Sequence, residues 1–126
     1  MPTNNFFEDI SSEILKLCVS PHRKPRSKEP DIHLQDFLMH IAALANVPES
    51  CFTEAAEMLG RLSEIYVGRL TRQNIIRLTF AALIVSASKH SLPYSLREWA
   101  AFGCYFYSRE EIKFMTEQLR AGLHVD

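Results

Sequence analysis

The sequence predicts an all-α protein, and three observations support this prediction. Apolar residues recur in several segments at the three- and four-residue spacing of an amphipathic helix. No segment of appreciable length alternates apolar and polar residues with the period of two that marks a half-buried strand. Residues 75 to 87 are apolar on nearly every face, and a helix of this kind is buried on all sides. We therefore expect about six helices, one of them central.

The N-terminal segment, residues 5 to 19, is predicted to form a short amphipathic helix. Phe7, Ile10, Ile14 and Cys18 lie on one stripe, and acidic residues near the start suit the positive end of the helix dipole. We expect this helix to pack on the rest of the chain with its apolar stripe inward. The alternative is a tail that folds only on a partner.

A linker separates this helix from the rest of the chain. Residues 20 to 30 contain three prolines and little apolar content. The chain is therefore predicted to divide into an N-terminal helix with its linker, residues 1–29, and a helical domain, residues 30–126.

Two amphipathic helices are predicted after the linker. The first begins near Asp31, a candidate N-cap, and its apolar stripe consists of Leu34, Phe37, Leu38, Ile41 and Ala45. After a turn at residues 46–50, the second runs to about Tyr66 and has an apolar face made of Phe52, Ala55, Ala56, Leu59 and Leu62. Gly60 interrupts this face at a cost of about 1 kcal/mol relative to alanine. A packing role is one explanation for it.

Three further helices complete the predicted domain. Thr71 is expected to cap the central helix, and Lys89 stands at its C-terminal end, where a cation is favoured. Ser95 caps a short helix that Gly103 ends. Ser108 and the glutamate three residues later have the form of a capping box. That box opens a last helix with the stripe Ile112, Met115, Leu119 and Leu123.

The composition does not favour nucleic acid as a partner. The 126 residues include 14 Lys and Arg against 15 Asp and Glu, a formal net charge of −1, so no global positive field exists. Arg61, Arg69, Arg72 and Arg77 lie near one connector, but we expect them to be scattered surface and structural arginines.

Cysteine usage and hydropathy indicate a chain that works inside the cell. Cys18, Cys51 and Cys104 are widely spaced and odd in number, so we expect buried, unreactive thiols rather than disulfides or a zinc site. The first residues lack the basic and apolar regions of a signal peptide. The longest apolar stretch, residues 80–85, is far shorter than the roughly 20 residues that span a bilayer. The expected location is the nucleus, the cytoplasm or both, without membrane association.

No catalytic motif occurs in the sequence. It contains no G-x-S-x-G, H-E-x-x-H or C-x-x-C pattern, and no glycine-rich loop. His33, Asp36 and His40 could share a helix face, but two turns separate the histidines by about 10 Å, too far for one metal ion. We interpret them as a solvated polar face. The chain is therefore not expected to be an enzyme, and no cofactor, metal or small-molecule substrate is expected.

The predicted central helix resembles the third helix of the cyclin box in P/U-type (phosphate-regulation-like) cyclins. The residues that carry this resemblance are Thr71, Asn74, Arg77, Ser88 and Lys89. Weaker similarities occur on both sides in the family's order, at Ile32–Leu38, Ser50–Phe52, Leu59–Leu62, Tyr94–Ser95, Trp99–Ala100 and Ser108–Ile112. The resemblance covers roughly residues 30 to 125. It implies a single cyclin box, five helices around a buried central helix, preceded by the N-terminal helix.

The resemblance implies a regulatory subunit that binds and activates the catalytic subunit of a cyclin-dependent kinase. Cyclins dock on the C helix of the kinase through their third and fifth box helices and hold it in the active position. Lys89 matches the family lysine that bonds to the kinase backbone. The matching family glutamate on the fifth helix is replaced by Thr116, and Glu117 lies one place further on. The alternative function is a cyclin-fold adaptor that binds another protein or nucleic acid without a kinase.

Overall fold

The computed structural model describes residues 4–18, 33–92 and 94–123, and the described part of the chain is all-helical. Its six helices are α1 (Asn4–Leu15), α2 (Leu34–Leu44), α3 (Glu49–Ile65), α4 (Ile75–Lys89), α5 (Leu96–Phe102) and α6 (Arg109–Leu123). The predicted all-α class is confirmed. The predicted linker, residues 20–30, and the candidate N-cap Asp31 lie outside the described residues.

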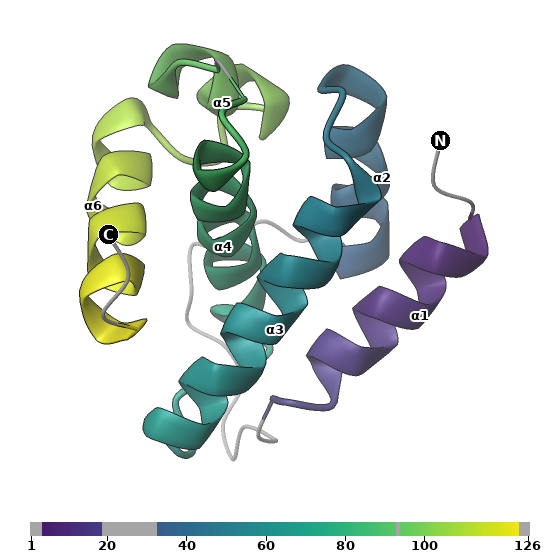
Figure 1. Ribbon diagram of the computed structural model, residues 1–126, viewed down its shortest axis with the longest axis vertical. Coiled ribbons are helices and arrows are strands. Elements are labelled where there is room, and N and C mark those ends of the chain that lie inside the picture. Colours follow the sequence, from purple (N-terminus) through teal and green to yellow (C-terminus); the bar gives the residue numbers. More distant parts are fainter. Residues whose placement is uncertain (1–3, 19–32, 93, 124–126) are drawn as a thin grey trace.

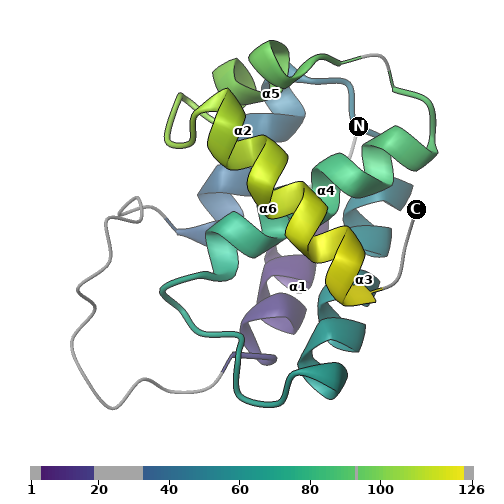
Figure 2. The same cartoon turned by 90° about the vertical axis from the view of Figure 1, so that its left-hand side faces the viewer.

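The helix α4 is the centre of the domain, as its apolar sequence predicts. Every residue from Thr79 to Ala87 is buried. The helices α3 and α6 contact α4 on different sides, and α2 adds a smaller contact (Figure 1). A quarter turn of the molecule shows α6 crossing in front of α4 (Figure 2). Little of α4 therefore reaches solvent except at its two ends.

The ring of Phe80 is a hub of the core. It is fully buried and makes edge-to-face contacts with Phe37 of α2, at 5.4 Å between ring centroids, and with Trp99 of α5, at 6.2 Å. Tyr107, on the segment before α6, lies at 6.0 Å. Such aromatic pairs add about 0.5–1.5 kcal/mol each beyond the apolar area they bury. Phe80 thus joins three parts of the chain to α4.

The first helix packs against α2 and α3, with its apolar stripe inward as predicted. Phe7, Ile10 and Ile14 are at most 4% exposed. The Phe7 ring meets Phe52 of α3 edge to face at 5.4 Å. This helix is therefore part of the folded core.

Two capping boxes fix the starts of α5 and α6. Ser95 accepts a hydrogen bond from the backbone N–H of Glu98, whose carboxylate accepts one in return from the N–H of Ser95. Ser108 and Glu111 make the same reciprocal pair. Each box satisfies two backbone donors that a helix start leaves without partners.

Two sequence-based expectations need correction. Thr71 does not cap α4, because the helix begins one turn later, after Asn74. Thr71 and Asn74 instead exchange two backbone-to-side-chain hydrogen bonds that close the turn before the helix. Gly60 has no packing role, because a Cβ built there would meet no atom within 4 Å.

Candidate functional site

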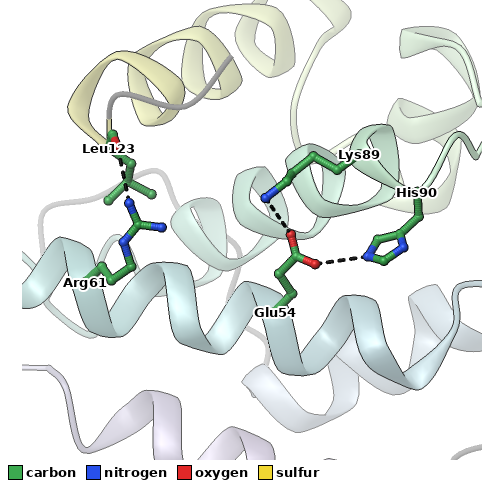
Figure 3. Close-up of polar contacts among 5 residues, drawn as sticks. All are labelled: Glu54, Arg61, Lys89, His90 and Leu123. Atoms are coloured by element: carbon green, nitrogen blue, oxygen red, sulfur yellow. Dashed lines mark hydrogen bonds and ion pairs between the residues drawn. The ribbon is translucent and has the colours of Figure 1, made fainter.

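Lys89 stands at the C-terminal end of α4 and is held by a carboxylate from α3. Its Nζ lies 3.0 Å from Oε1 of Glu54, and the side chain remains 49% exposed (Figure 3). The residue after it, His90, bonds to the other oxygen of the same carboxylate, Nε2 to Oε2, at 3.0 Å. Glu54 thus joins two neighbouring side chains at the end of the central helix.

The electrostatics of this cluster favour an ionised carboxylate. The hydrogen bond from His90 is the main cause that lowers the pKa of Glu54, and the Lys89 ammonium acts in the same direction. Partial burial of the carboxyl raises the pKa, but by less. An ammonium has three donors, and the pair with Glu54 occupies one side of it. Lys89 can therefore still bind acceptors from a partner.

A shallow hollow runs along α3 beside Lys89. Its lining includes Glu54, Glu57, Met58 and Arg61 of α3, together with Lys89. The hollow is open and carries both signs of charge. Such a surface suits contact with another polar protein surface rather than enclosure of a small apolar ligand.

Arg61 has a structural role at the far end of the hollow. Its Nη2 donates to the backbone oxygen of Leu123, 3.4 Å away, and so ties α3 to the last turn of α6 (Figure 3). Carbonyls at a helix end lack partners within the helix, and an arginine can satisfy them.

Among the described residues, no hydrogen bond or ion pair joins Thr116 or Glu117 to Lys89. Thr116 is 4% exposed, and its hydroxyl donates within α6, with the oxygens of Ile112 and Lys113 at 2.9 and 3.0 Å. Glu117 is exposed on α6. Among the described residues, the ion pair of Lys89 is with Glu54, and none links it to Glu117.

Sequence reasoning missed both Glu54 and His90 as members of this cluster. Glu54 is one of several acidic residues on the polar face of α3, and 36 positions separate it from His90. The sequence pointed to such a partner only through Lys89 itself, because a cation that is partly covered at the end of a buried helix needs a nearby anion.

Arg77 and Asn74, two other residues that carry the family resemblance, make contacts that stabilise the fold. The guanidinium of Arg77 lies over the ring of Tyr107, 5.6 Å from its centroid. Asn74 donates to the backbone oxygen of Arg69 at 2.8 Å, in addition to its bonds with Thr71. Asn74 and Arg77 line a second hollow together with residues of α6, whereas Lys89 lines the hollow on α3.

Two further findings concern metal binding and membrane crossing. Within the described ranges, no three His, Cys, Asp or Glu side chains gather closely enough to hold a metal ion. The same ranges contain no helix with the length and apolar character needed to cross a membrane.

No protein-family model, curated protein or solved structure matches this chain. The cyclin-like interpretation therefore depends on the residues quoted from the sequence and on the arrangement described above.

Proposed function

We propose that this chain is a regulatory subunit that binds and activates a cyclin-dependent kinase by holding the C helix of the kinase in its active position. Lys89 is the central contact residue of this proposal. The supporting observation is that Lys89 stands partly exposed at the end of the buried central helix, held by Glu54 beside the hollow on α3.

The pair with Glu54 gives Lys89 a function that a flexible surface lysine lacks. A lysine side chain loses up to about 2 kcal/mol of rotamer entropy when it is fixed. The carboxylate fixes part of this freedom before any partner arrives, which lowers the entropic cost of binding. The free donors of the ammonium would then bond to backbone oxygens of the kinase.

In this proposal Glu54 replaces the fifth-helix glutamate of the family as the carboxylate that accompanies the lysine. Thr116 is unsuitable, since its side chain is buried and its hydroxyl is already bonded within α6. Glu117 is the remaining acidic candidate on α6 and would have to act from its own exposed position.

The test is binding of the purified chain to cyclin-dependent kinase catalytic subunits, together with the phosphorylation activity of each mixture. Lys89→Ala should weaken binding by about tenfold or more, because partner carbonyls would be left unpaired at a cost of about 1–3 kcal/mol. Lys16→Ala removes an exposed lysine that follows α1 and serves as the matched control. Equal binding by wild type and Lys89→Ala would contradict the role of Lys89.

The adaptor alternative predicts a different outcome. Purification of the chain from its native cells would then yield a reproducible protein or nucleic-acid partner without a kinase catalytic subunit. The near-neutral charge of the chain does not favour nucleic acid.

A further inference from the structure

The thiol of Cys104 meets an imidazole from a distant part of the chain. Cys104 is exposed on the turn that joins α5 to α6, and its Sγ lies 2.9 Å from Nε2 of His40 on α2. At this separation the two groups share a proton: the thiol donates to Nε2, or the thiolate accepts from Nε2–H. A nucleophile and a base in this arrangement allow a thiol to react as the thiolate near neutral pH.

The contacts of the surrounding turn hold Cys104 at this position. Phe106 stacks on Phe37 of α2 with ring centroids 6.4 Å apart, and Phe37 lies one helical turn before His40. The contact that docks the turn on α2 therefore also brings the thiol to the imidazole. On the other side, Gly103 is buried against Phe80, where a Cβ would lie 3.0 Å from the ring.

The backbone of Cys104 is fixed as well. Cys104 and Tyr105 have φ values of 55° and 58°, in the left-handed region that residues other than glycine rarely adopt. Their N–H groups donate to the oxygens of Ala101 and Ala100 at 3.0 and 2.9 Å. These bonds stabilise an otherwise unfavourable conformation and limit the movement of Cys104 away from His40.

The other two cysteines differ from Cys104 in their exposure and in their hydrogen bonding. Cys51 is fully buried and Cys18 is half-buried, and burial raises the pKa of each thiol. Within the described ranges, neither sulfur is hydrogen-bonded to an imidazole. The expectation that the three thiols are buried is therefore wrong for Cys104, which is exposed.

Among the described residues, His40 and Cys104 have no second charged partner. Over the described residues, neither an ion pair nor a second side-chain hydrogen bond joins His40 or Cys104 to an acidic or basic group. Asp36, four residues before His40, shares its face of α2.

We propose that Cys104 is a modification site at which a hydroperoxide oxidises the thiol, with His40 as the base. Nε2 of His40 takes the thiol proton, and the thiolate attacks one peroxide oxygen. The S–O bond forms as the O–O bond breaks, and the departing oxygen takes the proton from the imidazolium and leaves as water or an alcohol. The sulfur loses two electrons and becomes a sulfenic acid, while the peroxide is reduced. This inference does not depend on a kinase partner.

The test treats the folded wild-type chain with hydrogen peroxide in the presence of dimedone, which traps sulfenic acids, and follows each cysteine by peptide mass spectrometry. Cys104 should be labelled at least about tenfold faster than Cys18 or Cys51. At pH 7, His40→Gln should lower the Cys104 rate by a similar factor. His33→Gln removes an exposed histidine seven residues away and should change nothing.

A measurement on the wild type alone guards against a His40→Gln variant that fails to fold. The alkylation rate of Cys104 by iodoacetamide is recorded from pH 5 to 10 and compared with that of an unstructured cysteine peptide. At pH 7, Cys104 should react at least about tenfold faster than the peptide cysteine. A Cys104 rate at pH 7 equal to that of the peptide, or a folded His40→Gln variant that reacts as fast as wild type at pH 7, would overturn the proposal.

Discussion

Truncation of Leu83 tests the central position of α4. Leu83 has no exposed surface and lies in the middle of the buried stretch of α4. Leu83→Ala removes about three carbon groups, each worth about 0.8 kcal/mol of transfer free energy, or about 2.4 kcal/mol together. A cavity that stays open adds up to about 2 kcal/mol. The expected loss of unfolding free energy is therefore about 2–5 kcal/mol.

The assay is urea denaturation followed by circular dichroism, with thermal unfolding in parallel. The midpoint should fall without a change in slope, and the melting temperature should drop by roughly 10–20 °C. Leu44→Ala is the matched control, because Leu44 is 52% exposed at the end of α2 and should change stability by less than about 0.5 kcal/mol. Equal losses in the two variants, or a loss near zero for Leu83→Ala, would refute the assignment of α4 as the central helix.

Four further predictions concern stability. Gly60→Ala should raise the unfolding free energy by about 0.5–1 kcal/mol in urea titration, because a mid-helix glycine is replaced where a Cβ meets nothing. Gly103→Ala should lower it by about 1–3 kcal/mol, since the new Cβ would crowd the Phe80 ring. Ser108→Ala should lower the melting temperature by the equivalent of about 1 kcal/mol through loss of the capping box. The pKa of Glu54 is lowered from 4.5, so its stabilising effect is present above that pH and disappears as acid protonates the folded carboxylate. The unfolding free energy of the wild type should therefore fall between pH 5 and pH 3. In Glu54→Gln it should fall by less over the same range, as measured by urea titration at each pH.

The elements with strong local patterns could be predicted from the sequence. The inward stripe of α1 and the capping box at Ser108 depend on residues three or four positions apart. The burial of α4 follows from its lack of any polar face. In these cases the spacing of residues within a single helix determines the feature, so the packing of neighbouring helices need not be known.

The candidate site could be predicted only in part. Lys89 was identified from the end of the helix and the family resemblance, but its partner Glu54 comes from another helix and depends on how α3 crosses α4. The pair of His40 and Cys104, 64 residues apart, likewise depends on the docking of a turn on α2. Thr116 stands at the position of the family glutamate, and the sequence did not indicate that its hydroxyl donates within its own helix.

The order of the helices along the chain has a consequence for synthesis on the ribosome. The central helix α4 ends at Lys89, whereas α6, which covers one of its sides, is complete only at Leu123. At 5–20 residues per second, the nascent chain presents an apolar helix without its last cover for about two to seven seconds. During that interval we expect the apolar surface of α4 to be open to chaperones that bind exposed apolar segments. Mutations that delay the docking of α6 should therefore lower the yield of folded protein in cells by more than their effect on its equilibrium stability predicts.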